Sequence, residues 1–290
     1  MKTFKKRSIN VLFTLVSGSA GESEKIEFDG LRVSTRVHFT PGAYGGADIQ
    51  IFGLTKEFMR RLIAMYAFGW TGNNWVNNRI ALRYVDETTV TIFEGGIVSA
   101  LVDYNTAPDV PLAIYASTTF EEQMTVPGGL NFPGTTSIEY ILRRILDNLP
   151  ERKLDNQGVT GTLTDTSVNG SVMDMIDQVC RYANIDYWMV NNVLVIAPKG
   201  SQFEGETPIE LTPENGLAGW PVLTESGCNA VALYSPDFAA MRTVNLSCPD
   251  LFDGKQMFYI TGLTHELDSE VPGGRWHTRL TLGLNTPARQ

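Results

Sequence analysis

The chain has few of the residues from which metal sites, disulfide frameworks and nucleophilic active sites are built. Only three cysteines and three histidines occur among its 290 residues. Cys180, Cys228 and Cys248 are scattered without Cys-x-x-Cys spacing, so neither a disulfide framework nor a zinc site is predicted. We expect buried thiols in a reducing cytoplasm, with a bridge between Cys228 and Cys248 as the alternative.

Long apolar runs and an excess of basic charge are also missing. No uninterrupted apolar stretch approaches the roughly 18 to 20 residues that a membrane-spanning helix needs, so membrane insertion is not expected. The formal net charge is -9: residues 1–115 carry 12 basic and 11 acidic side chains, residues 116–205 carry 6 and 11, and residues 206–290 carry 5 and 10. A basic groove that grips nucleic acid is therefore disfavoured, whereas an acidic wall past which DNA slides is compatible with the charge.

Sequence motifs of catalysis are absent as well. The chain has neither a G-x-S-x-G nucleophile elbow nor a phosphate-binding G-x-x-x-x-G-K loop. The three histidines, His38, His265 and His277, fall on predicted strands. His265 and His277 could approach each other across a hairpin, but no third ligand stands at a fixed spacing from them. No metal ion or cofactor is predicted.

A peptidoglycan hydrolase is the natural enzyme to consider, and it would need two carboxylates that face each other across a cleft. The candidate pairs are Glu121 with Glu122, and Glu266 with Asp268. Adjacent glutamates are expected to point apart, and Glu266 and Asp268 share the polar side of a strand, where a solvated surface is the simpler interpretation. We therefore predict no enzyme activity and no catalytic residue.

The first twenty residues allow two interpretations. A basic start, MKTFKKR, an apolar stretch over residues 9–16 and small residues at 18–20 are typical of a secretory signal. The alternative is a first strand, in which Ile9, Val11, Phe13 and Leu15 form one face at period two. We favour the strand, and a mature chain that begins at Gly21 would support the signal.

Residues 1–115 are predicted to be mostly β. Residues 31–39 alternate strictly between apolar and polar side chains, which is typical of a half-exposed strand. One helix interrupts the strands, with Thr55 as its N-cap and with Phe58, Leu62 and Met65 on its buried face. In the loop that follows, Trp70 and Trp75 either pack into their own domain or form a contact surface. Further strands are predicted at residues 47–54, 79–85, 90–102 and 110–116, with a bulge at 94–96.

Residues 116–205 are predicted to form a small α/β domain. A helix over residues 135–149 would bury Ile138, Ile141, Leu142, Ile145 and Leu149. A strand over residues 159–163 precedes a second helix. Residues 169–171 lead into this helix, and its buried face comprises Val172, Met175, Ile176, Val179 and Tyr182. Strands 186–190 and 193–197 then form a hairpin across Asn191 and Asn192, because asparagine tolerates the positive φ of a tight turn.

Residues 206–290 return to β structure. Strands are predicted at residues 220–224, 229–234 and 241–247. The chain closes on a long hairpin, residues 256–270 and 276–284, in which Trp276, Leu280, Leu282 and Leu284 lie on one face. These strands are enough for a small barrel.

Four segments together resemble one protein family. They are ADIQIFGLTKEFMRRL at residues 47–62, the helix and hairpin of residues 168–196, VALYSPDFAAMRTVNLS at residues 231–247, and the closing hairpin. Their order and spacing resemble the central hub protein of contractile phage tail baseplates. This chain is shorter than the large hubs.

The resemblance implies an α+β, mainly β fold, with two tube-like β-barrel domains (1–115 and 206–290) that flank a small α/β domain (116–205). It implies a homotrimer in the virion baseplate, assembled in the host bacterial cytoplasm. Its partners would be the tail tube protein ring, the central spike protein, the tape-measure protein and the baseplate wedge proteins, with DNA passing only in transit. The alternatives are the hub of a non-contractile phage tail and a secreted β-rich binding protein with a cleaved signal.

Overall fold

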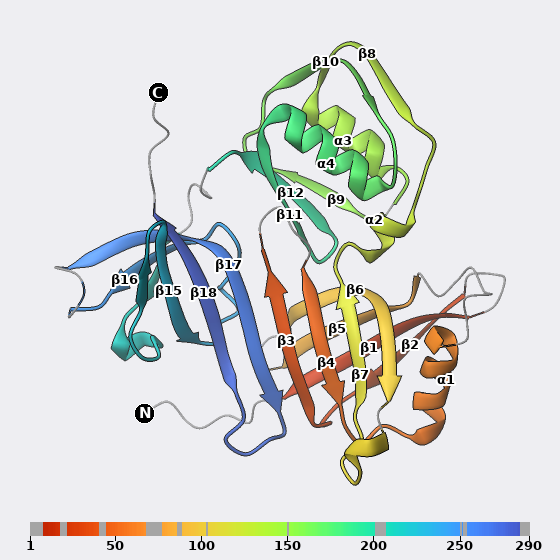
Figure 1. The fold of residues 1–290 in the computed structure, drawn as a ribbon, viewed down its shortest axis with the longest axis vertical. Helices are drawn as coiled ribbons and strands as arrows, with labels where there is room; N and C mark the ends of the chain where they lie inside the picture. Colours follow the sequence, from red (N-terminus) through yellow and green to blue (C-terminus); the bar gives the residue numbers. More distant parts are fainter. Residues whose placement is uncertain are drawn as a thin grey trace. The chain divides into compact units, whose positions relative to one another are not determined.

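The computed structural model describes residues 8–17, 22–40, 45–67, 77–85, 89–102, 104–149, 151–200, 207–249, 251 and 254–284. The described chain is mainly β, with a helical module in the middle of the sequence (Figure 1). It divides into two compact units: unit 1 comprises residues 1–38, 46–120 and 265–277, and unit 2 comprises residues 39–45, 121–264 and 278–290. No helix of the described residues has the length and apolar character needed to cross a membrane.

Unit 1 is built on an antiparallel sheet. Its strands are β1 (Ile9–Ser17), β2 (Glu22–Phe28), β3 (Val33–Phe39), β4 (Gly46–Ile51), β5 (Arg79–Val85), β6 (Thr89–Val102) and β7 (Leu112–Ser117). They follow the order β3-β4-β7-β6-β5-β1-β2. A short 3-10 helix, Tyr104–Thr106, lies between β6 and β7. All the strands predicted in this part of the sequence are confirmed, and β2 is added to them.

Residues 9–17 form β1, a strand in the core of unit 1. Ile9, Val11, Phe13 and Leu15 are all fully buried, and β1 pairs with β2 on one side and with β5 on the other. Period-two burial between two neighbouring strands is the pattern of a core strand. The strand prediction is therefore confirmed for these residues.

Helix α1 (Lys56–Ala67) begins as predicted. The backbone N–H of Phe58 donates to the Thr55 hydroxyl at 3.3 Å, and Leu62 is fully buried. The Phe58 ring makes edge contacts with the rings of Phe13 and Phe28, and the ring centroids are 5.1 Å apart in both pairs. The loop with Trp70 and Trp75, and the side chain of Met65, lie outside the described residues.

The predicted bulge at residues 94–96 is wrong. The β5–β6 register is regular there, and the register shifts lie on either side, next to Ile92 and Val98. The two glycines serve a different purpose: a Cβ on Gly95 would lie 2.6 Å from the carbonyl oxygen of Ser117, and one on Gly96 would lie 3.0 Å from the Phe120 side chain. Glycine is required because neighbouring groups approach the strand closely.

The middle of the sequence forms a helical module within unit 2. Its elements are α2 (Phe120–Met124, of which residues 121–124 belong to unit 2), β8 (Leu130–Ser137), α3 (Ile138–Leu146), β9 (Lys153–Asn156), β10 (Thr162–Val168), α4 (Val172–Ala183), β11 (Ile185–Val190) and β12 (Val193–Pro198). Strands β8 and β10 pair with each other, and β11, β12 and β9 form a second sheet. The predicted α/β character of this region is confirmed.

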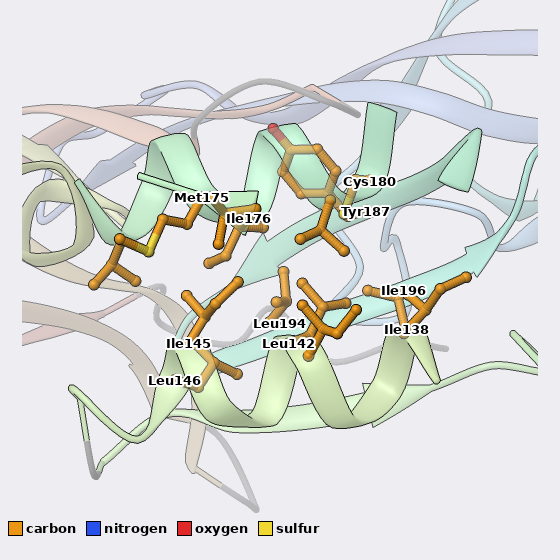
Figure 2. Packing of buried hydrophobic residues seen from close by; sticks show 14 of the residues in the cluster. Ile138, Leu142, Ile145, Leu146, Met175, Ile176, Cys180, Tyr187, Leu194 and Ile196 are labelled. Atoms are coloured by element: carbon orange, nitrogen blue, oxygen red, sulfur yellow. The ribbon is translucent and has the colours of Figure 1, made fainter. Parts of the chain in front are cut away.

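The core of the module lies between α3, α4 and the β11–β12 hairpin. Figure 2 shows Leu142 and Ile145 of α3, Ile176 of α4 and Leu194 of β12 pointing toward one another, and all four are fully buried. Helix α4 opens with a capping box, in which the Ser171 hydroxyl accepts from the Asp174 N–H and the Asp174 carboxylate accepts from the Ser171 N–H.

Three predictions for this module need correction. Helix α3 begins at Ile138 rather than at residue 135, because residues 130–137 pair with β10. The strand expected at 159–163 lies at 162–168, since Val159 is held by a hydrogen bond from its N–H to Asn156 Oδ1 at 2.7 Å. Tyr182, expected on the buried face of α4, is 61% exposed. In the hairpin turn Asn191 has a φ of +52°, in agreement with the expected tight turn.

A buried ion cluster fastens α2 to the rest of the module. The Arg152 side chain is 1% exposed and donates to both carboxylate oxygens of Glu122, which is fully buried. It also donates to Glu121 Oε2 at 3.2 Å and to Asn192 Oδ1. Burial raises the pKa of the Glu122 carboxyl, and the Arg152 guanidinium opposes that shift. The expectation that Glu121 and Glu122 point apart is wrong, since both contact one guanidinium.

The remainder of unit 2 is a second β region. Its strands are β13 (Ile209–Leu211), β14 (Val222–Thr224), β15 (Gly227–Leu233), β16 (Thr243–Ser247), β17 (Lys255–Ser269) and β18 (Trp276–Leu284), with a 3-10 helix at Pro213–Asn215. The predicted strands are confirmed, and β13 is added. Among the described residues the strands form an open path that ends at β14 and β2, so closed barrels are not found there. The three-domain division remains a prediction, and its boundary at 205/206 lies outside the described residues.

The closing hairpin supplies strands to both units, since β17 and β18 are each divided between them. Trp276, Leu280 and Leu282 are buried on one face as predicted, whereas Leu284 is 40% exposed. In unit 1 the backbone N–H of Ile9 donates to the Ser269 hydroxyl at 3.0 Å, so the end of β17 contacts the beginning of β1.

Replacing Gly227 with alanine tests the packing of β15. A Cβ at this position would lie 1.9 Å from the carbonyl oxygen of Leu282, so the backbone must shift. We expect Gly227→Ala to lower the free energy of unfolding by about 1–3 kcal/mol, measured by urea denaturation. Gly128→Ala is the matched control, because no atom lies within 4 Å of the place that its Cβ would occupy, and it should change stability by less than about 0.5 kcal/mol.

Replacing Arg152 with methionine tests the buried ion cluster. The variant leaves Glu122 buried without its cation, which costs about 3–5 kcal/mol of unfolding free energy. Loss of Arg152 raises the pKa of Glu122 further. A carboxyl whose pKa is higher in the folded than in the unfolded state makes the folded protein less stable as the pH rises from the unfolded to the folded pKa. The loss of stability should therefore be larger at about pH 8 than at about pH 5.

The double variant Arg152→Met with Glu122→Gln is the control for that experiment. It removes both charges, so it should recover a large part of the lost unfolding free energy and should lack the additional pH dependence. Urea denaturation at both pH values measures this. An Arg152→Met variant that loses the same free energy at both pH values would contradict the proposed role of the cluster.

Candidate functional site

Exposed apolar side chains gather at one strand edge of unit 2. Trp220 is 66% exposed, Val222 is 62% exposed and Leu223 is 53% exposed. The last two belong to β14, which pairs with β15 through three residue pairs and ends the strand order of the described residues. We name Trp220, Val222 and Leu223 the β14 edge. Free backbone groups next to apolar side chains are a surface on which another chain can pair.

A hollow of 640 Å³ borders the β14 edge. Residues of β15, β17 and β18 line it. These three strands are neighbours in the sheet (Figure 1). Its wall is mixed: Trp220 and Val222 are apolar, whereas Arg279 and a row of threonines are polar. Within that row Thr261 donates from its hydroxyl to the carbonyl oxygen of Thr281 at 3.0 Å. The threonines lining the hollow are Thr40, Thr261, Thr264 and Thr281.

The edge strand of unit 1 has the opposite character. Strand β2 pairs with β1 and ends the strand order at the other side, and its Glu24, Lys25 and Glu27 side chains are exposed. Arg61 donates to Glu24 at 2.5 Å and, through that hydrogen bond, lowers the pKa of Glu24. Charged side chains along an edge oppose pairing with a further strand. Of these two edges, the β14 edge is therefore the one suited to a partner.

The candidate acids Glu266 and Asp268 do not lie on a solvated surface, and that expectation is wrong. Glu266 is buried and accepts from Arg36 at 3.0 Å, and its other oxygen lies 2.9 Å from His277 Nε2. Asp268 accepts from Ser34 at 2.7 Å and from Arg275 at 3.0 Å. These contacts join β3, β17 and β18 within unit 1.

The environment of Asp268 favours the ionised carboxylate over the protonated acid. Burial alone would raise the pKa of Asp268, but the hydrogen bonds from Arg275 and Ser34 lower it overall. Each of its oxygens is already hydrogen-bonded to the protein. Such a group holds strands together, whereas an acid catalyst needs a raised pKa and access to substrate.

The three histidines lie in different environments and do not form one site. His265 is buried, and desolvation lowers its pKa to about 4, so the ring is neutral at physiological pH. His277 contacts Glu266, and the His38 ring covers Gly46, where a Cβ would come within 2.6 Å of it. In the part of the chain that the structure describes, no group of three potential ligand side chains could hold a metal ion.

The cysteines are free and buried. Burial raises the pKa of the Cys180 thiol to about 12 and raises that of Cys228 as well, so neither forms a reactive thiolate at neutral pH. The structure does not contain the Cys228–Cys248 bridge that was the alternative.

Sequence reasoning predicted a strand near residues 220–224 but did not identify an exposed edge there. Two adjacent apolar residues, Val222 and Leu223, break the alternation of a half-buried strand, but such a pair indicates burial on both faces, so no local signal predicted their exposure in the single chain. Position at the end of a sheet depends on long-range pairing, which one strand's sequence does not contain.

Comparisons with known proteins point to phage tails. The chain has the fold of a tail protein from Neisseria meningitidis MC58, with a TM-score of 0.63 at 10% identity over 96% of this chain and 97% of the other. The 43 kDa tail protein of prophage MuSo2 from Shewanella oneidensis gives 0.63 at 8% identity over 97% and 99%.

A third structure connects this fold to a secretion system. The E. coli c3393 protein gives a TM-score of 0.62 at 9% identity over 88% of this chain and 74% of the other. It is described as a component of the type VI secretion system with structural similarity to the T4 bacteriophage tail proteins gp27 and gp5. No curated protein sequence matches the chain.

The sequence itself matches a protein family over most of its length. The model of the family described as baseplate hub gp41 matches residues 9–269. This range includes the resembling segments at residues 47–62, 168–196 and 231–247, and all of β17. The chain therefore belongs to the baseplate hub gp41 family, whose members are structural components of the phage tail rather than enzymes.

Proposed function

We propose that the chain is the homotrimeric central hub of a contractile-tail baseplate. Each subunit contributes two tube-like domains, residues 1–115 and 206–290, on either side of the module at residues 116–205. Three subunits then present six such domains in a ring, on which the first hexameric ring of the tail tube is seated. The opposite side of the trimer holds the central spike. In this role the chain is a part of the virion tail, assembled in the host cytoplasm.

The observation that carries this proposal is the β14 edge in a chain of the hub family. An edge strand with Trp220, Val222 and Leu223 exposed is unfavourable in an isolated subunit, because apolar area remains in water and backbone groups remain unpaired. A neighbouring subunit in a closed ring covers such an edge. The open strand path of the single chain agrees with domains that are completed by their neighbours.

The charge of the chain supports a lumen through which DNA passes. The net charge is -9. Residues 116–205 and 206–290 together carry 21 acidic and 11 basic side chains. An acidic surface repels the phosphate backbone instead of retaining it. DNA and the tape-measure protein are therefore expected in transit only.

A secreted binding protein is the weaker alternative. A signal cleaved after Ala20 would remove β1, whose four apolar side chains are fully buried between β2 and β5. Sequencing of the N-terminus of the purified protein distinguishes the two, since a chain that starts at Gly21 would favour secretion.

The double variant Val222→Lys with Leu223→Lys tests the assembly. We expect the unaltered chain to be a trimer at micromolar concentration in sedimentation equilibrium, and to form ring-shaped particles with tube protein in negative-stain images. Burying either side chain contributes about 1.5–3 kcal/mol, so the variant should associate at least about tenfold more weakly.

Val126→Lys is the control for this experiment. Val126 is 71% exposed and lies outside the β14 edge, so its substitution should leave the trimer intact. An unaltered chain that stays monomeric at tens of micromolar, or a β14-edge variant that associates as strongly as the control, would contradict the proposal.

A further inference from the structure

Two Asn-Gly pairs occur in the sequence, Asn169 with Gly170 and Asn215 with Gly216. Residues 169–171 connect β10 to α4, and Gly216 is the C-cap of the 3-10 helix that ends at Asn215. In such a pair the main-chain nitrogen of glycine can attack the side-chain amide of asparagine, because glycine has no Cβ to obstruct the approach. The reaction therefore depends on how the fold holds each asparagine and the N–H of its glycine.

The side chain of Asn169 is not held by the fold. The residue is exposed, and its side chain makes no hydrogen bond with any described residue. The N–H of Gly170 likewise donates to none of the residues that the structure describes. No hydrogen bond therefore has to break before the Asn169 side chain turns toward the nitrogen of Gly170.

Gln178 of α4 makes the nitrogen of Gly170 more acidic. Its Nε2 donates to the main-chain carbonyl oxygen of Asn169 at 2.7 Å, and this carbonyl belongs to the same peptide group as the Gly170 nitrogen. When that nitrogen loses its proton, negative charge moves onto the carbonyl oxygen. A donor already aimed at this oxygen stabilises the anion. The fold therefore favours the form of Gly170 that attacks the asparagine side chain.

Asn215 is held in a way that opposes the same reaction. Its Nδ2 donates to the carbonyl oxygen of Glu210 at 2.8 Å, and its backbone N–H donates to the Thr212 hydroxyl at 3.1 Å. The carbonyl oxygen of Gly216 accepts from the Leu233 N–H at 2.7 Å. Turning the Asn215 side chain toward Gly216 breaks the first of these bonds. This pair has the same chemistry in a restrained conformation, so it is an internal control.

We propose that Asn169 is a modification site, at which the folded chain deamidates through a succinimide with water as the co-substrate. The Gly170 nitrogen loses its proton to solvent and bonds to Asn169 Cγ. The bond between Cγ and Nδ2 breaks, and the amide nitrogen takes a proton from solvent and leaves as ammonia. Water then opens the ring: opening at Cγ gives aspartate, and opening at the main-chain carbonyl gives isoaspartate. No group is oxidised or reduced.

Either product places a new carboxylate immediately before α4. Isoaspartate also lengthens the main chain at residue 169 by one carbon and converts the carbonyl that accepts from Gln178 into a carboxylate. The connection between β10 and α4 therefore changes as the protein ages. This site lies outside the β14 edge, and the reaction does not depend on the proposed trimer.

The test compares the two asparagines within one chain. The full-length protein is incubated at mildly alkaline pH and body temperature, in parallel with the same protein unfolded in concentrated urea. Mass spectrometry of proteolytic peptides follows the conversion of Asn169 and Asn215, and electron-transfer fragmentation distinguishes isoaspartate from aspartate. In the folded chain we expect Asn169 to be converted at least about tenfold faster than Asn215, to both products. In urea the two rates should be similar, because glycine follows both residues.

Gln178→Leu tests the role of the donor. It removes the hydrogen bond to the Asn169 carbonyl at nearly constant side-chain size, so conversion of Asn169 should slow by at least about threefold in the folded chain and stay unchanged in urea. Gln157→Leu is the matched control: Gln157 is exposed in the same module, and its side chain donates to Asp155 instead. This variant should deamidate at Asn169 as the unaltered chain does.

Equal rates at Asn169 and Asn215 in the folded chain would overturn the proposed site, and this comparison stands even if Gln178→Leu folds poorly. Aspartate as the sole product would do the same, because direct hydrolysis of the side-chain amide gives no isoaspartate. A folded Gln178→Leu variant with an unchanged rate would remove the role of the donor. A chain that deamidates at Asn169 but remains monomeric would support this site and count against the proposed trimer.

Discussion

The long hairpin of β17 and β18 is the constraint on which the rest of the structure depends. Buried residues alternate with more exposed ones over residues 257–262 of β17 and 276–282 of β18, so a shift of one residue would expose the buried face of these segments. The residues of the two strands are divided between the two units, and each unit's sheet is completed by part of them. In unit 1 the contact of Ser269 with Ile9 ties the end of the hairpin to the first strand.

The two strand edges of the described chain differ in chemistry. At one end of the strand order, β2 presents charged side chains that oppose further pairing; at the other end, β14 presents Val222 and Leu223 to solvent. A structural protein of the tail works by contact with other proteins. The chemistry of its edges therefore takes the place that a catalytic cleft takes in an enzyme.

Buried charges in this chain maintain structure. Arg152 joins α2 to the hairpin turn through Glu122 and Asn192, and Glu266 joins β3 to β18 through Arg36 and His277. The carboxylates of Glu122 and Glu266 each have cationic partners within the fold. The pairs considered from the sequence as acids make structural contacts, and two of the partners, Ser34 and Arg36, lie 234 and 230 positions away in the sequence.

The sequence alone determined the local elements: β1 from its alternating face, α4 from Ser171 and the helical spacing after it, and the hairpin turn from Asn191. These depend on residues close to one another, whose periodicity and capping chemistry are visible in a single chain. The tertiary structure decided the shift of α3, the close approach at Gly95, the sharing of Arg152 by two glutamates and the exposure of β14. Each of these depends on which distant strand or side chain comes alongside, and no local pattern of residues records that pairing.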